Sequence, residues 1–295
     1  MAALELRVDG KRARSDGSDD GGGGKRQLVE AGTVHVRDPA HDGMLMWLSE
    51  DSAVLWVPGA LCLSPVDAMN LYSHMDSDDV CPPTPNPMNS NSVLRRKQKT
   101  FGTKAYDFGQ KCPHESEREK WPNAVEQALT VSEQVISVLE GSGLPPVLAL
   151  VPPHGEKPVS TVLNTVHTNL YRDSNVALKM HSDDEKQMVK GAPICSFTVL
   201  MAERMAAGSA RDDVPRPFCV FKKPLVVDRK LRAADQPPDN VESAEYAFYL
   251  CDGDLLVMLG SMQDEFWHSV PPVATRKKAE KSPQPRINMT VRAFA

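Results

Sequence analysis

The chain has 295 residues, of which 41% are hydrophobic and 25% are charged, and its formal net charge is -5 at pH 7. This length allows one large domain or two small ones around a sizeable core. The acidic balance excludes a wholly basic nucleic-acid coat protein, because affinity for phosphates comes from clustered Lys and Arg. The sequence contains no apolar run of about 18 residues, the length that a membrane-spanning helix needs.

The N-terminal residues 1–27 are rich in Gly, Asp, Ser, Lys and Arg. We expect a disordered tail there, because such a segment cannot bury enough apolar surface to offset the entropy of ordering. Two basic clusters in it, Lys11–Arg14 and Lys25–Arg26, are spaced like a two-part nuclear import signal. Six scattered cysteines with no CxxC pair and no secretory signal are typical of reduced thiols. We therefore expect a soluble intracellular monomer in the nucleus, with the cytoplasm as the alternative.

The first predicted element of the folded part is a strand at residues 53–58, which a proline ends. Ordered structure is therefore expected from about Ser52 onward. The preceding residues 28–51 form an extension for which the sequence predicts no element. A stretch rich in Pro, Asn, Ser and Asp at residues 76–92 predicts an exposed loop.

Two helices are predicted in the first half of the chain. The first should begin at Pro65, because Ser64 is a good N-cap and Asp67 can close the cap. The second should span residues 122–140, where apolar residues fall broadly on one face and Gly141 supplies the stop.

The second half of the chain predicts strands that are short, rich in β-branched or aromatic residues, and separated by Gly, Pro and Asp. These strands are residues 162–170, 194–200, 218–221, 246–250, 255–259 and 287–294. Several strands with turn signals between them indicate a sandwich or a double-sheet jelly roll. With the two helices in front, the sequence predicts one α+β domain at residues 52–295.

A candidate metal site begins with His181 and Asp183, which form a His-x-Asp pair. Residues two apart in a strand point to the same face, so both side chains can bind one ion. Such a pair is common by chance and is more often an ordinary surface pair. His268, just past a predicted strand, offers a third ligand. Two His and one carboxylate form the facial triad of non-haem Fe(II) oxygenases, which leaves positions for O2 and a co-substrate.

Residues 286–292 alternate strictly between polar and apolar side chains. In a strand, one face would carry Arg286, Asn288, Thr290 and Arg292. Beside an iron ion this face could hold a dicarboxylate, because a guanidinium pairs bidentately with a carboxylate while Thr and Asn add neutral hydrogen bonds. A half-exposed edge strand with a charged outer face would show the same alternation, and without the upstream triad it is the favoured interpretation.

Five segments carry a family resemblance, and they occur in the family's order: Asn169–Arg172, His181–Glu185, Gly253–Met258, Trp267–Pro271 and Arg286–Arg292. The chain resembles the AlkB family of Fe(II)- and 2-oxoglutarate-dependent dioxygenases, and it is most similar to the eukaryotic enzymes that repair alkylated DNA and RNA. The resemblance covers about residues 52–295. It implies a double-stranded β-helix (jelly-roll, cupin-like) at about 160–295, N-terminal helices, and a substrate-recognition lid at about 93–120.

The resemblance also implies roles for individual residues. Those expected to bind Fe(II) are His181, Asp183 and His268. Those expected to hold 2-oxoglutarate are Asn169, Tyr171, Arg286, Asn288, Thr290 and Arg292. Arg286 would pair with the distal carboxylate of the co-substrate. Arg292 would lie near the carboxylate that chelates the metal and would also steady Asp183.

The lid resemblance lies in Arg95–Gly102 and Tyr106–Gly109, where aromatic residues stand between basic ones. Rings can stack on an extruded base while Lys and Arg hold the backbone. The residues expected to contact the substrate are Asp184, Glu185, Phe101, Tyr106, Phe108, Arg95 and Arg96. The two acids would favour bases made cationic by methylation, such as 1-methyladenine and 3-methylcytosine. Three long connections depart from the family's pattern, at residues 76–92, 198–217 and 224–245.

The activity that the resemblance implies is oxidative removal of N-methyl groups from DNA or RNA, on a single strand or a flipped base. It would use Fe(II), 2-oxoglutarate and O2 and release formaldehyde and succinate. Regulatory demethylation of 6-methyladenine in RNA, and oxygenation of protein side chains, are alternatives on the same fold. A non-catalytic binding module is a third alternative. The complete set of ligands and arginines speaks against it, because an inactive scaffold has no physical need for them.

Overall fold

The computed structural model describes ten stretches of the chain: residues 5–7, 33–37, 42–86, 89–104, 112–141, 163–173, 176–201, 216–224, 239–272 and 285–295. The predicted nuclear signal lies outside these residues, as do Tyr106 and Phe108 of the predicted lid. Most of the two later connections, at 202–215 and 225–238, also lies outside them.

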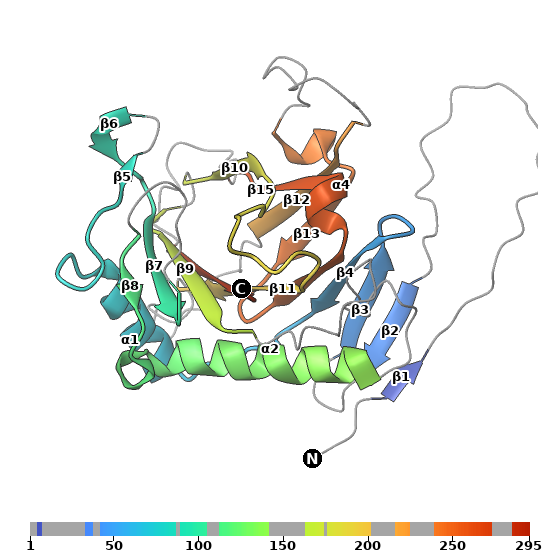
Figure 1. The fold of residues 1–295 in the computed structure, drawn as a ribbon, viewed down its shortest axis with the longest axis horizontal. Coiled ribbons are helices and arrows are strands. Elements are labelled where there is room, and N and C mark those ends of the chain that lie inside the picture. Colours follow the sequence, from blue (N-terminus) through green and yellow to red (C-terminus); the bar gives the residue numbers. More distant parts are fainter. Residues whose placement is uncertain are drawn as a thin grey trace, which may run out of the picture.

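Two β-sheets form the body of the protein, the smaller one above the larger one in Figure 1. The larger sheet has, in the described residues, the order β1 (Glu5–Arg7), β2 (Thr33–Arg37), β3 (Asp42–Trp47), β4 (Ser52–Val57), β14 (Leu255–Gly260), β11 (Ile194–Leu200), β16 (Arg286–Arg292), β9 (Thr165–Tyr171), β7 (Lys97–Gly102) and β8 (His114–Glu115). The smaller sheet has the order β10 (Leu178–His181), β15 (Phe266–Val270), β12 (Arg216–Lys222) and β13 (Tyr246–Leu250). The two sheets confirm the predicted jelly roll and the α+β class.

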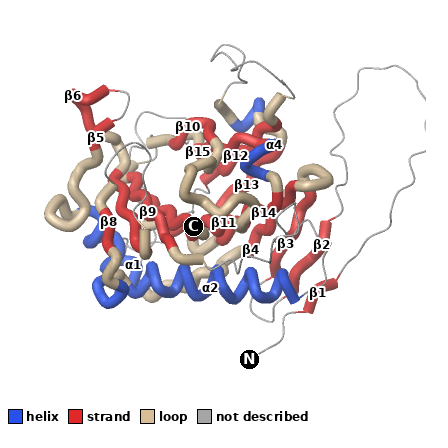
Figure 2. Tube along the Cα trace, in the orientation of Figure 1, coloured by secondary structure: helices blue, strands red, loops and turns tan. Residues whose placement is uncertain are grey.

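Helices α1 (Pro65–Asp76) and α2 (Asn123–Gly141) cover the outer face of the larger sheet, and α2 runs along it in Figures 1 and 2. The predicted cap of α1 is present, because the side chain of Ser64 accepts a hydrogen bond from the backbone N–H of Asp67 at 3.0 Å. A short helix, α4 (Met262–Glu265), links β14 to β15. No helix in the described residues is both long and apolar enough to cross a membrane. The six cysteines all lie in the described residues, and none of them forms a disulfide.

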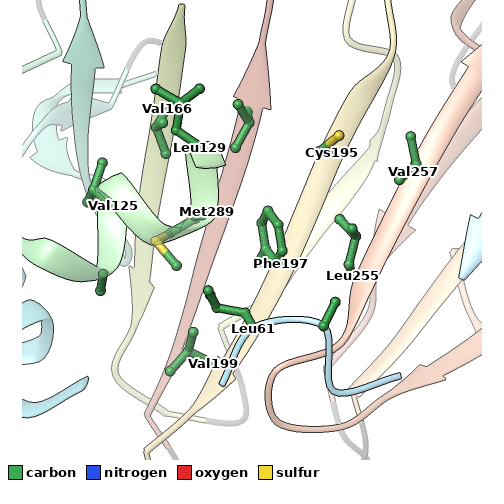
Figure 3. Packing of buried hydrophobic residues seen from close by; sticks show 14 of the residues in the cluster. Leu61, Val125, Leu129, Val166, Cys195, Phe197, Val199, Leu255, Val257 and Met289 are labelled. Carbon is green, nitrogen blue, oxygen red and sulfur yellow. The ribbon is translucent and has the colours of Figure 1, made fainter. Parts of the chain in front are cut away.

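The main hydrophobic core lies between these helices and the larger sheet. Figure 3 shows Val125 and Leu129 of α2 beside Val166 of β9 and Met289 of β16. Burying one such side chain fully stabilises the fold by about 1.5 to 3 kcal/mol. A second core, which includes Phe218 of β12, lies between the two sheets.

The alternation of β16 comes from its central place in the larger sheet. β16 pairs with β11 on one side and with β9 on the other, and all of its residues are buried. Its apolar residues Ile287, Met289 and Val291 belong to the helix-side core. Its polar residues line a cavity between the sheets. The edge-strand interpretation is therefore wrong, because both faces of this strand are covered.

Three parts of the chain differ from the predictions. The sheet begins before Ser52, because β3 pairs with β4 and β2 extends the ladder. Residues Glu5–Arg7, inside the predicted disordered tail, pair with β2 as β1. The predicted loop at 76–92 contains most of a hairpin formed by β5 (Pro85–Asn86) and β6 (Asn89–Val93). β1 and β5 are very short, and the Asp and Gly of β3 and the Pro and Asn residues of β5 and β6 have weak strand preference, which hides the strand pattern in these segments.

The Gly253–Asp254 part of the resemblance has a structural explanation. Gly253 has a φ of +79° in the turn between β13 and β14, a conformation that favours glycine. A Cβ there would lie 2.6 Å from the backbone oxygen of Leu61. The carboxylate of Asp254 accepts hydrogen bonds from the indole of Trp56 and the backbone N–H of Gly59, at 3.1 and 2.9 Å. This pair therefore anchors a turn and does not reach the cavity.

Candidate metal centre and co-substrate pocket

His181 and His268 come from two paired strands of the smaller sheet, and Asp183 comes from the loop that follows β10. One ligand atom from each lies within 4.8 Å of the others. His181 Nε2 lies 3.6 Å from Asp183 Oδ1, and His268 Nε2 lies 3.9 Å from Asp183 Oδ2. β10 and β15 pair directly at the two histidines, which explains why their ring centroids are only 4.2 Å apart. The convergence that the sequence predicts is present in the structure.

The imidazoles are oriented by their neighbours. His181 Nδ1 lies 2.8 Å from the backbone oxygen of Lys179. If Nδ1 carries the proton and donates it there, Nε2 keeps its lone pair for a metal. The ring of His268 stacks on Phe218, with centroids 5.3 Å apart and an interplanar angle of 15°. Strand pairing, one backbone hydrogen bond and one aromatic contact thus hold both rings in place.

The charge states of the buried ligands suit a divalent cation. Burial raises the pKa of Asp183, but Arg292 and the two imidazoles outweigh it and hold this pKa at about 2. Arg292 Nη2 lies 2.8 Å from Asp183 Oδ1, which is the contact expected from the resemblance. Burial also lowers the pKa of His268 to about 3. At neutral pH these two groups are a carboxylate and a neutral imidazole, the forms that bind metal.

A cavity of about 650 Å³ opens beside the three ligands. This volume is within the range of sites for small molecules. The polar side chains of β16 line it, namely Arg286, Asn288, Thr290 and Arg292. The side chain of Asn288 donates to Ser196 Oγ and to the backbone oxygen of Phe197, both at 2.9 Å. Thr290 Oγ1 donates to Asn288 Oδ1 at 3.0 Å, so this wall is already ordered.

Arg286 has the burial, charge and unused hydrogen-bond donors of a residue that can bind an anion. It is 2% exposed and lines the cavity, and its Nη2 donates to Thr198 Oγ1 at 3.0 Å. Its Nε and Nη1 have no hydrogen-bond partner among the described residues. Burial lowers its pKa to about 10, so the guanidinium remains charged at neutral pH. A carboxylate of 2-oxoglutarate would satisfy both the charge and the unused donors.

Tyr171 and Asn169 take different places around this pocket. Tyr171 is fully buried and does not line the cavity, but its ring lies 5.4 Å from the guanidinium carbon of Arg286. Its hydroxyl has no partner among the described residues. Asn169 lines the cavity, and its Oδ1 accepts from Arg96 Nε at 3.1 Å.

Only some of the residues predicted to contact the substrate line the cavity. Arg95, Arg96 and Glu185 line the cavity, and Glu185 Oε1 lies 3.4 Å from Arg292 Nη1. Asp184 is exposed and contributes nothing to the cavity lining, so the structure separates it from its neighbour.

Phe101 was expected to stack on the substrate, and this expectation is wrong. Its side chain is fully buried in the helix-side core, where its ring centroid lies 6.0 Å from that of Trp121. The cause is strand parity, because Gln98 and Thr100 of β7 pair with the cavity-facing residues of β9 and Phe101 points the other way. Tyr106 and Phe108 lie outside the described residues.

Several cavity residues were missed by the sequence analysis: Gln98, His167, Lys179, Ser196 and Phe218. His167 Nδ1 lies 3.1 Å from Thr100 Oγ1, which ties β9 to β7. Burial, Arg292 and Arg96 hold the pKa of His167 well below its usual value, so its imidazole is neutral. A signal for it did exist, because His167 stands two residues before Asn169 and therefore shares its face of the strand.

Comparison with known proteins decides the family. A family model described as the 2OG-Fe(II) oxygenase superfamily matches residues 47–292. The chain belongs to this superfamily. It is also 29% identical over 153 residues to alpha-ketoglutarate-dependent dioxygenase alkB homolog 3 of Bos taurus, a match that spans 50% of this chain and 42% of that protein. The solved structure of OsALKBH1 is 17% identical and covers 85% of this chain and 100% of its own, with a TM-score of 0.44.

The members of this superfamily use Fe(II), 2-oxoglutarate and O2. The residues present fit these groups. Two histidines and one aspartate are the donor set that non-haem Fe(II) prefers, and three protein ligands leave coordination positions open. The unused donors of Arg286 fit a carboxylate of the co-substrate.

Proposed function

We propose that this oxygenase removes N-methyl groups oxidatively from bases of DNA or RNA that are single-stranded or flipped out of a duplex. The observation that carries the proposal is the lining of the cavity, which includes the three metal ligands and the cations Arg95, Arg96 and Lys179. Arg95 and Lys179 are exposed, so they can meet phosphates while a base enters. The similarity to an AlkB homolog supports a nucleic-acid substrate.

The bound iron, with 2-oxoglutarate and O2, would supply the oxidation of a methyl C–H bond, after which formaldehyde leaves the restored base. The residues of this chain position the reactants. Arg286 would bind the distal carboxylate of the co-substrate, and Arg292 would keep Asp183 ionised and aimed at the metal. Asp183, Arg286 and Arg292 are buried, which strengthens their charge interactions with each other and with a bound co-substrate.

Glu185 is the acid that we expect to recognise the base. It lines the same cavity as the metal ligands, whereas the adjacent Asp184 points to solvent. A methyl group on N1 of adenine or N3 of cytosine makes the base cationic, and a nearby carboxylate favours a cation. The position of Glu185 supports 1-methyladenine and 3-methylcytosine as substrates. Part of its negative charge is compensated by an ion pair with Arg292.

We predict that Glu185→Gln lowers kcat/KM for 3-methylcytosine by about tenfold or more, because a hydrogen bond to a charged partner contributes roughly 1.5 to 3 kcal/mol. The neutral base 6-methyladenine should be little affected. Asp184→Asn is the matched control, since it removes the neighbouring acid outside the cavity. Equal losses in the two variants, or an equal loss on both bases, would contradict this role of Glu185.

A panel of methylated oligonucleotides tests the function itself. The purified protein, with Fe(II), ascorbate and 2-oxoglutarate, is incubated with DNA and RNA that carry 1-methyladenine, 3-methylcytosine or 6-methyladenine, single and double stranded. Mass spectrometry of the nucleosides and an assay for formaldehyde follow the reaction. We expect demethylation of the two cationic bases. A product from 6-methyladenine in RNA alone would replace repair by a regulatory role, and turnover of methylated peptides alone would replace both.

A further inference from the structure

The backbone around Asp183 is not held by a β-ladder. β10 pairs with β15 at Leu178↔Val270 and again at His181↔His268, with a register shift between the two pairs, and it ends at His181. Asp183 follows after the strand has stopped. A metal ligand outside a ladder must be positioned by other contacts, because a small displacement of one ligand changes the geometry that the metal experiences.

Two side-chain contacts take the place of the missing ladder. The backbone N–H of Asp183 donates to the side-chain oxygen Oε1 of Gln263 at 2.8 Å. Ser182 Oγ donates to the backbone oxygen of Phe266 at 3.2 Å. Both contacts connect the ligand-bearing loop to α4 and the start of β15, the segment that leads to His268. The segment from α4 to β15 therefore carries the ligand His268 and also positions the ligand Asp183.

Gln263 is itself held on two sides. Its Nε2 donates to Met258 Sδ at 3.3 Å, and its backbone oxygen accepts from Lys223 Nζ at 2.7 Å. These contacts leave its Oε1 directed at the backbone of Asp183. The carboxylate of Asp183 is meanwhile fixed by Arg292. The backbone and the side chain of this ligand thus have separate supports.

We propose that Gln263 is a positioning residue for the metal centre, which holds Asp183 in place before the ion binds. This inference rests on the proposed iron site and not on the nucleic-acid substrate. Gln263 does not line the cavity and is not among the candidate ligands, so its effect must pass through Asp183. Outer-shell partners of metal ligands typically change metal affinity by about 10- to 100-fold.

The test is a metal titration of the purified, metal-free full chain. Co(II) is added under anaerobic conditions, and its visible absorption bands report binding at the triad. We expect Gln263→Met, which keeps the size of the side chain and loses the acceptor, to weaken Co(II) binding by about tenfold or more. Gln263→Glu keeps an acceptor in reach of the Asp183 N–H and should retain affinity close to that of the unchanged protein. Gln134→Met, on the exposed face of α2, is the matched control.

The outcomes separate the inference from the site on which it rests. Unchanged Co(II) affinity in a folded Gln263→Met variant overturns the positioning role, and so does a loss of the same size in Gln263→Glu. If Gln263→Met fails to fold, Gln263→Asn replaces it, since the shorter side chain leaves the N–H unsatisfied without a change of chemistry. If His181→Ala binds Co(II) as tightly as the unchanged protein, the iron site itself is wrong.

Discussion

His181→Ala will abolish the conversion of 2-oxoglutarate to succinate and all demethylation. The substitution removes one of three metal ligands, and the remaining pair, Asp183 and His268, cannot hold the ion in the geometry that the reaction needs. Succinate formation by the purified variant, measured with Fe(II) present and omitted, gives the result directly. Co(II) titration of the same sample should show that metal binding is lost.

The matched control for this prediction is His114→Ala. His114 is exposed and is not one of the candidate metal ligands. Its ring nitrogen Nε2 lies 2.9 Å from the backbone oxygen of Gly102. This variant should keep both activity and metal binding. Normal turnover in His181→Ala would refute the assignment of the triad, whatever substrate the enzyme has.

Arg286→Met will raise the concentration of 2-oxoglutarate needed for half-maximal rate by about 10- to 100-fold, with metal binding largely kept. A charge-assisted hydrogen bond contributes roughly 1.5 to 3 kcal/mol, and Arg286 offers unused donors to the co-substrate. Methionine has a similar size and no charge, so the pocket keeps its shape. Kinetics at varied 2-oxoglutarate, together with the Co(II) titration, separate the two effects.

The same substitution should weaken co-substrate binding but raise or preserve the thermal stability of the protein without co-substrate. Without co-substrate, Arg286 is a buried cation with no anionic partner among its described contacts, and a buried unpaired charge carries a desolvation cost that an apolar side chain does not have. Arg286→Met should therefore melt at or above the temperature of the unchanged protein. Added 2-oxoglutarate with Co(II) should stabilise only the unchanged protein strongly. An equal ligand-induced shift in both proteins would rule out Arg286 as the anchor.

Much of the fold could be predicted because local signals agreed with the tertiary structure. The N-cap of α1 at Ser64 and the stop of α2 at Gly141 follow from residue types whose preferences act within one turn of helix. The strands at 194–200 and 246–250 were predicted with the bounds that they have in the structure. β2 and β3 were missed, because their stability comes from pairing along the edge of a sheet that local sequence does not reveal.

The candidate site divides in the same way. His181 and Asp183 were paired from the period of a strand, and they do share one site, but β10 ends at His181 and contacts from a distant segment place Asp183. Phe101 was assigned to the wrong face, because the parity of β7 depends on its register with β9. Gln263 had no signal at all, since its importance comes from a contact with a loop distant in sequence.

The sequence by itself determined the chemical types of the groups: two imidazoles, one carboxylate, and a strand with alternating arginine, asparagine and threonine. Residue identity and strand period are local properties, so they can be read without a fold. Only the tertiary structure decided which groups share the cavity, that Glu185 faces it while Asp184 does not, and that Arg286 is buried with unused donors. Register, burial and hydrogen-bond partners depend on contacts between distant segments, and they exist only once the sheets have formed.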